Sequence, residues 1–257
     1  MIERIVPDEP SPIGAGLIGI VSGLGPLAGS DVLDKALAYA AATYGAVEDA
    51  DYPDIVLFSH GIEHFDSTGG FDDNFVRELV AVVQEIELHR PTVLGIACNT
   101  AHLHLAELRK HTRAHVVNLI EETAEAAAAH ELNYLLLCSS ATRRAGLYHE
   151  ALRRRGVRFL DVSEVDQLEV DDVVQAVMAH DVEAAAAQLD ELILRIESEP
   201  FNAIIAGCTE LPMAFDLTDV ADEIPVVDSN RVLAHALVDT YFALRSAHPA
   251  LASVAGR

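Results

Sequence analysis

The chain alternates between short runs of apolar residues and longer stretches in which apolar residues recur every three or four positions. Short apolar runs are typical of buried strands, whereas the longer period is typical of amphipathic helices. The apolar runs predict strands at 16–22, 54–59, 93–98, 115–118, 133–138, 203–207 and 225–227, with a weaker one at 157–161. The helical period predicts helices at 30–44, 72–89, 100–112, 120–130, 143–155, 170–179, 182–198 and 229–245.

This order of elements predicts an α/β fold, because buried strands that alternate with helices form parallel sheets with right-handed crossovers. A single barrel needs one regular series of strand–helix pairs, but here the strongest strand ends fall into two similar sets. We therefore expect two pseudo-symmetric doubly wound domains with parallel sheets and an active site in the cleft between them. The expected domains are residues 1–117 plus 226–257, and residues 118–225.

Two segments of the chain resemble each other. Residues 93–102 read VLGIACNTAH and residues 203–212 read AIIAGCTELP. In each, a buried strand ends in a cysteine, Cys98 or Cys208, and polar residues then open a helix. Ligands of open α/β sheets bind beyond the carboxyl ends of the strands, where a helix N-terminus offers free N–H groups and a positive dipole end. We expect such cysteines to have lowered pKa values.

Polar residues follow both cysteines. Asn99, Thr100 and Thr209 are suited to cap the helices or to hold an anionic group of a ligand. Glu210 stands two positions after Cys208, where its carboxylate could hydrogen-bond to the thiol or repel the thiolate.

A glycine-rich turn follows the first predicted strand. Residues 23–28, GLGPLA, fit the G-x-G-x-x-A pattern of dinucleotide sites. Pro26 removes an N–H donor from the turn, however, and no strand ends in an acidic residue about 20 positions further on, as such a site needs. We interpret Gly25 and Pro26 as a tight turn that brings the backbone close to a small carboxylate.

Other interpretations of the cysteines stay open at this point. Free cysteines are often small core residues. Cys98, His102 and Cys208 are also residue types that bind zinc, although no C-x-x-C pair accompanies them. Cys138 ends another predicted strand and suits a ligand site and a core position equally well.

Charge and composition limit the partners. The chain has 17 Lys and Arg against 41 Asp and Glu, a net charge of -24. It would repel a phosphate backbone and an anionic membrane surface, so we expect neither nucleic acid nor membrane as a partner. Residues 1–12 carry acids and prolines instead of a basic and apolar leader, and three cysteines cannot all pair internally. We therefore expect reduced thiols and a cytoplasmic location.

Together the motifs resemble the aspartate/glutamate racemase family. The resemblance is carried by the segments at 23–28, 97–102 and 207–212, with Ala-Gly-Leu-Tyr at 145–148, and it runs over about residues 14–245. It implies a racemase or epimerase that needs no cofactor, acts on a small amino acid or carboxylic acid, and forms a homodimer. It also implies that Cys98 and Cys208 act as acid and base. The residues that would hold the substrate carboxylate are Asn99, Thr100, Thr142 and Thr209.

The side chain of the substrate stays open. Aspartate-specific members usually carry a basic residue in the stretch equivalent to 46–53 and a lysine near Met178, and this chain has neither. The substrate would be of the aspartate or glutamate class, a different amino acid, or a related acid. Within the wider superfamily, isomerisation or decarboxylation of a small dicarboxylic acid is an alternative, as in a maleate isomerase with one nucleophilic cysteine. A small-acid-binding protein without catalysis is another.

Overall fold

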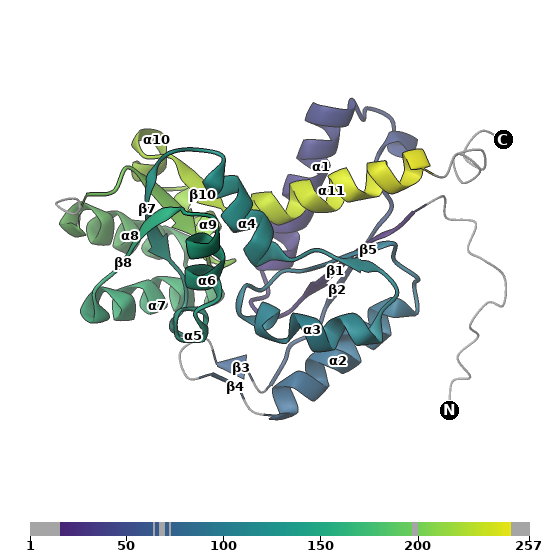
Figure 1. The fold of residues 1–257 in the computed structure, drawn as a ribbon, viewed down its shortest axis with the longest axis horizontal. Helices are drawn as coiled ribbons and strands as arrows, with labels where there is room; N and C mark the ends of the chain where they lie inside the picture. The colour runs from purple at the N-terminus through teal and green to yellow at the C-terminus, as the bar shows by residue number, and fades with distance from the viewer. Residues whose placement is uncertain (1–15, 64, 67–69, 72, 197–199, 248–257) are drawn as a thin grey trace.

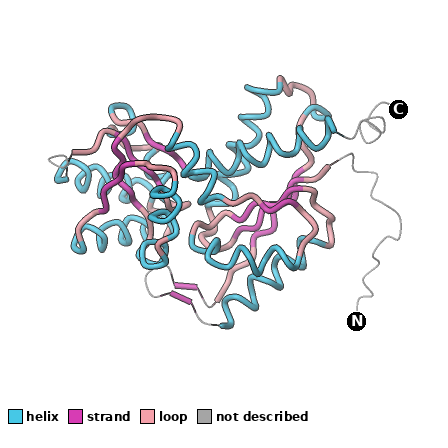
Figure 2. The backbone as a smooth tube through the Cα atoms, viewed as in Figure 1, coloured by secondary structure: helices cyan, strands magenta, loops and turns pink. Residues whose placement is uncertain are grey.

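The computed structural model describes residues 16–63, 65–66, 70–71, 73–196 and 200–247. Two units stand side by side, each with a parallel sheet at its centre and helices on both faces (Figures 1 and 2). This confirms the predicted α/β class with two doubly wound sheets. Within these described ranges, no helix combines the length and the apolar character that crossing a membrane requires.

The two sheets share one topology. The first has the order β2-β1-β5-β6 and the second the order β8-β7-β9-β10, read from the equivalent edge. Each unit therefore places its first and third strands at the centre and its second and fourth at the edges. The strands of the first sheet are β1 (Ile18–Ser22), β2 (Ile55–Ser59), β5 (Val93–Ile96) and β6 (His115–Val116), and those of the second are β7 (Asn133–Leu137), β8 (Arg158–Asp161), β9 (Ala203–Ala206) and β10 (Val226–Asp228).

Alternate strand residues build the cores, because successive side chains of a strand point to opposite faces. In the first unit, Ile18 and Ile20 pack with α1 (Ala28–Tyr44) and α11 (Ser229–Ala247), while Val21 packs with the opposite helices. Those helices are α2 (Asp73–Glu87) and α3 (Leu105–Leu108).

The second unit follows the same rule. Leu135 and Leu137 pack with α7 (Glu164–Met178) and α8 (Val182–Ile196). Tyr134 and Leu136, which point the other way, pack in the cluster formed by the two helices on the other face. Those helices are α4 (Leu119–Ala128) and α6 (Leu147–Arg154).

The units exchange helices. Helix α4 follows the last strand of the first sheet but packs on α6 of the second unit, and α11 follows the last strand of the second sheet but packs on α1. Strand β10, which starts at Val226, pairs with β9 in the second sheet, and α11 then carries the chain back to α1. The predicted domain limits stay a prediction, and their ends, 1–15 and 248–257, lie outside the described residues.

Helix limits differ from the predicted ones by more than two residues in three places. The expected helix 100–112 is three short pieces, η2 (Thr100–His104), α3 and η3 (Arg109–His111). The expected helix 143–155 starts earlier, as α5 (Ser140–Ala145), and is divided from α6 by Gly146, whose φ is 67°. Helix α7 starts at Glu164 instead of 170, because Ser163 caps it by accepting a hydrogen bond from the backbone N–H of Asp166.

Elements too short for a periodic pattern were not predicted. They are η1 (Asp49–Asp51), the antiparallel pair β3 (Phe65–Asp66) and β4 (Gly70–Phe71), and α10 (Val220–Glu223). The helix expected after Cys208 is the short α9 (Leu211–Phe215). Residue 72 of the expected helix 72–89 and residues 197–198 of the expected helix 182–198 lie outside the described residues.

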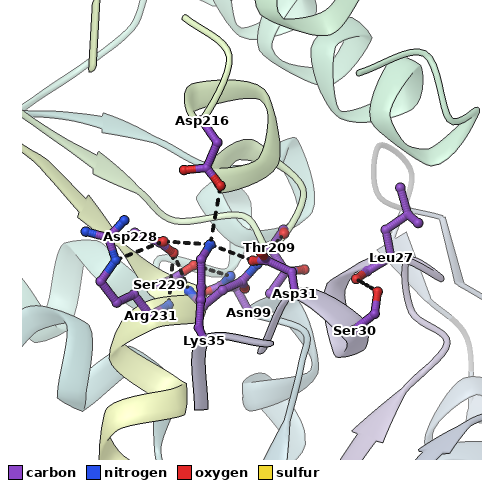
Figure 3. Close-up of polar contacts among 11 residues, drawn as sticks. Leu27, Ser30, Asp31, Lys35, Asn99, Thr209, Asp216, Asp228, Ser229 and Arg231 are labelled. Carbon is purple, nitrogen blue, oxygen red and sulfur yellow. Dashed lines mark hydrogen bonds and ion pairs between the residues drawn. The ribbon is translucent and has the colours of Figure 1, made fainter. Parts of the chain in front are cut away.

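A partly buried lysine joins the two units (Figure 3). Lys35 of α1 places its Nζ atom 2.7 Å from Asp31 Oδ2 in the same helix and 2.8 Å from Asp228 Oδ2 at the end of β10. Asp216, after α9, lies 3.9 Å away. Burial alone lowers the pKa of Lys35, but Asp228 and Asp31 outweigh it and hold the pKa above its ordinary value. The ammonium is therefore charged and bound from both units.

Lys35→Met should lower the free energy of unfolding by about 3 kcal/mol, since it takes the ammonium away from the buried Asp228 and the partly buried Asp31. Chemical denaturation followed by circular dichroism measures the change. Lys110→Met is the matched control, because Lys110 is the other lysine of the chain and pairs with Glu107 on the surface. The control should be nearly neutral. Equal effects of the two substitutions would contradict a joining role for Lys35.

Candidate active site

The carboxyl ends of the four central strands meet at a small pocket between the units. Leu24 follows β1, Cys98 follows β5, Ser139 follows β7 and Cys208 follows β9, and all four line the pocket. This is where ligands of open α/β sheets bind. The remaining lining residues are Asn99, Thr100, Val174, Met178, Thr209 and Glu210. The pocket has a volume of about 10 Å³, room for roughly one water molecule, so its walls must part for a larger ligand.

Most of the predicted site residues lie at this pocket. The residues that line it are Cys98, Asn99, Thr100, Cys208, Thr209 and Glu210. Thr142 stands behind the wall, with its Oγ1 atom 2.7 Å from Thr100 Oγ1. Gly25 lies against Glu210, and Pro26 is not among the lining residues. The sequence did not single out Leu24 and Val174, since an apolar residue gives no local sign that it faces a ligand.

Both thiols are buried, and this reverses the expected direction of their pKa shifts. Burial raises the pKa of Cys98 to about 12, although the backbone N–H groups of Ala101 and Thr100 act against the rise. Burial also raises the pKa of Cys208 well above its usual range, and the negative charge of Glu210 adds to the effect. The predicted N–H donors are present, but in the closed pocket the loss of solvation outweighs them.

Cys208 is hydrogen-bonded to a buried carboxyl group. Its Sγ donates to Glu210 Oε2 at 3.0 Å, and Thr209 Oγ1 donates to the same oxygen at 3.1 Å. Glu210 Oε1 is buried and has no hydrogen-bond partner within the part of the chain that the structure describes. Burial raises the pKa of the Glu210 carboxyl group, whereas the two hydrogen bonds act to lower it. The thiol proton of Cys208 therefore lies in the hydrogen bond between its sulfur and the Glu210 carboxyl oxygen.

The glycine-rich turn packs against that carboxyl group. Gly25 has a φ of 106°, and a Cβ atom there would collide with Glu210 Oε1. Gly23 has a φ of 102°, and a Cβ atom there would collide with the backbone of His60. Both positions require glycine for conformation and for space. The turn does bring backbone close to a carboxylate, but in the structure this carboxylate is the protein's own.

Asn99 is held from both units. Its Nδ2 donates to Ser229 Oγ at 3.4 Å (Figure 3), and its Oδ1 accepts a hydrogen bond of 2.5 Å from the hydroxyl of Tyr148 in α6. Gly207 leaves room for the Tyr148 ring, because a Cβ atom there would approach the ring to 2.7 Å. The amide at the first cysteine is thus positioned by a side chain that packs beside the second.

A hydroxyl cluster lies beside Asn99. Thr100 Oγ1 lies 3.4 Å from Ser139 Oγ, in addition to its contact with Thr142. Ser139 also caps α5, since its Oγ accepts a hydrogen bond of 3.3 Å from the backbone N–H of Thr142. These hydroxyls come from the ends of β5 and β7 and are suited to donate to a carboxylate.

The zinc interpretation is not supported, because both ring nitrogens of His102 are engaged by the backbone. Nε2 accepts from the N–H of Leu119 at 3.1 Å, which places the ring proton on Nδ1, 2.8 Å from the carbonyl oxygen of Cys98. Burial lowers the pKa of His102 to about 4, so the ring is neutral. The described residues contain no group of three or more His, Cys, Asp or Glu arranged to hold a metal.

Cys138 is a core residue and not part of the pocket wall. It is buried in the cluster with Tyr134, Leu136 and Tyr148, and burial raises the pKa of its thiol. Of the two roles left open for Cys138, the structure supports the core.

Comparison with known proteins identifies the family. Residues 21–237 match the family model described as Asp/Glu/Hydantoin racemase. The chain therefore belongs to this family, as its motifs predicted, and its enzyme class is an isomerase, an amino-acid racemase.

Individual relatives cover nearly the whole chain. The broad-specificity amino-acid racemase RacX of Bacillus subtilis is 25% identical over 230 residues, which are 90% of this chain and 100% of that protein. The structure of Picrophilus torridus aspartate racemase matches with a TM-score of 0.76 and 26% identity, over 89% of this chain and 95% of that one. Glutamate racemase from Thermus thermophilus, at 19% identity and a TM-score of 0.63, covers 96% of this chain and 95% of its own and shares the fold.

Glu210→Gln should lower the pKa of both pocket thiols, because the carboxylate charge raises both. Cys208 should shift further than Cys98, since only Cys208 also donates a hydrogen bond to Glu210. Thiolate formation would then begin at lower pH in the variant. The measurement is the NMR shift of isotope-labelled cysteine Cβ atoms over a pH series.

Cys138 serves as the internal reference in the same spectra. Its pKa is raised first by burial, and Glu210 is not among the causes. A uniform shift of all three thiols, or unchanged titration of Cys208, would contradict the assigned effect of Glu210.

Proposed function

We propose that the protein racemises an amino acid by a two-base mechanism with Cys98 and Cys208. The observation that carries this proposal is that both thiols line one pocket and follow β5 and β9, the topologically equivalent third strands of the two units. Inversion at Cα needs one group that removes the proton on one face and another that returns a proton on the opposite face. Two thiols at equivalent strand ends that line one pocket are suited to supply such a pair.

The proton balance involves three groups. Glu210 accepts the proton of Cys208, to which it is already hydrogen-bonded. The Cys208 thiolate then takes the proton from Cα as the C–H bond breaks, and the Cys98 thiol gives its proton to the other face of the carbanion. The reverse reaction starts from the Cys98 thiolate that remains. General acid–base catalysis by a placed side chain contributes about 10²–10⁴-fold, or roughly 3–5.5 kcal/mol.

The carbanion also needs stabilisation of the charge that develops on its carboxylate. Asn99, Thr100 and Thr209 stand beside the two sulfurs in the pocket wall. They are suited to hold the substrate carboxylate, and Thr142 supports Thr100 from behind. Preorganised donors in a closed pocket stabilise an oxyanion more strongly than water does. The same closure that raises the thiol pKa values thus favours the enolate-like intermediate.

The relatives support an amino-acid substrate. One is titled a broad-specificity amino-acid racemase and another an aspartate racemase. The second thiol in the pocket favours racemisation over decarboxylation, which needs a single proton donor. The homodimer and the cytoplasmic location stay predictions.

Cys98→Ala and Cys208→Ala should each abolish racemisation, with a drop of about 10²–10⁴-fold or more. Each variant should still exchange the α-proton of one enantiomer with solvent, because one base remains on one face, and the two variants should prefer opposite enantiomers. Proton NMR in D₂O with separate L- and D-amino acids, together with polarimetry, measures both effects.

Cys138→Ala is the control, because this third buried thiol lies in the core and outside the pocket wall. It should retain racemisation. Retained racemisation in either of the other two variants would rule out the two-base mechanism.

A further inference from the structure

The pocket has two unlike walls. The strand ends supply hydroxyl, amide and thiol groups, whereas Leu24, Val174 and Met178 supply apolar surface. Val174 and Met178 stand four positions apart in α7 and therefore share one face of that helix. Leu24 and Val174 are fully buried, and Met178 is half-buried. A ligand that lies between the cysteines and places its carboxylate at the polar wall therefore also contacts the apolar wall with another part of the molecule.

The apolar wall is held in place by the same face of α7. Gln167, Asp171, Val174 and Met178 form one stripe at helical spacing. The polar half of the stripe anchors the helix, since Gln167 Nε2 donates to the carbonyl oxygen of Cys138 at 2.9 Å and Asp171 accepts from the N–H of Ser140 at 2.9 Å. The apolar half then faces the pocket. The hydrogen bonds of Gln167 and Asp171 therefore fix the position of the apolar wall.

The only charged side chain that lines the pocket among the described residues is Glu210. Lys35, the lysine that joins the units, is bound by Asp31 and Asp228. Arg143 of α5 is bound by Glu164 and Gln167. A second carboxylate on the substrate would therefore be buried against apolar surface without a cation and would be repelled by Glu210.

We propose that the substrate is an α-amino acid with an uncharged, apolar side chain, and that Val174 and Met178 form the subsite for this side chain. The inference rests on the proposed function, because it assumes that an amino acid is bound between the two cysteines. The thioether of Met178 is flexible and polarisable, so the subsite accepts apolar side chains of several shapes. Aspartate and glutamate are poor substrates.

The first experiment compares substrates with the unaltered protein. L-Methionine, L-leucine, L-aspartate and L-glutamate are incubated separately in D₂O, and loss of the α-proton signal gives kcat/KM for each. The apolar amino acids should exceed the acidic ones by at least about a hundredfold, the discrimination that a hydrophobic pocket shows against an added polar group. Faster exchange of aspartate or glutamate overturns the assigned subsite.

The second experiment changes the charge of the subsite. Met178→Lys should raise the ratio of kcat/KM for aspartate to that for methionine by about tenfold or more, because the ammonium pairs with a side-chain carboxylate. Met178→Leu should keep the apolar preference. Leu168→Lys is the matched charge control, since Leu168 lies in the same helix and is 64% exposed. The control should leave the ratio unchanged.

The outcomes separate this inference from the proposed function. Exchange of acidic amino acids alone, or equal changes in Met178→Lys and Leu168→Lys, overturns the apolar subsite and leaves racemisation standing. Absence of exchange with every amino acid overturns both. Preference for apolar amino acids with a shift confined to Met178→Lys supports both.

Discussion

The ion pairs of Lys35 are the constraint on which the site depends. The lysine joins α1 of the first unit to Asp228 at the end of β10 in the second. The two residues after Asp228 then contact both cysteine-bearing turns, since Ser229 accepts from Asn99 and Asn230 donates to the carbonyl oxygen of Thr209 at 2.8 Å. The Lys35 ion pairs thus tie α1 to the junction of β10 and α11, and this junction contacts both cysteine-bearing turns.

Burial of the pocket keeps the thiols protonated in the free protein, and it also strengthens the electrostatic interactions that the proposed reaction needs. The closed pocket raises the pKa values of Cys98 and Cys208, so both are thiols at rest and are protected from oxidation and from metals. In the proposed reaction, the same loss of water strengthens the interaction of the N–H and hydroxyl dipoles with the substrate carboxylate. Because the pocket holds about one water molecule, its lining residues must move to admit a substrate.

Local sequence patterns predicted the features that depend on neighbouring residues in the chain. Both cysteine turns, the parallel strands and the glycine turn were found from periodicity and spacing, because strand ends of a parallel sheet meet at one edge. Three features were missed. Lys35 forms an i,i+4 pair with Asp31 that is typical of a surface helix, and its second partner lies near the other end of the chain. The direction of the thiol pKa shifts depends on burial, which a motif does not encode. The wall of α7 is apolar and looks like core in sequence.

In our proposals, the parts that the two units share carry the chemistry, and the parts in which they differ recognise the substrate side chain. The proposed chemistry uses the ends of the equivalent strands β5 and β9, and both thiols that follow them line the pocket. Between its second and third strands, the first unit carries β3, β4 and α2, whereas the second carries α7 and α8. Inversion of a stereocentre needs two matched bases, but recognition of one side chain needs a wall on one side only. Substitutions in α7 therefore can change the substrate without altering the residues that move protons.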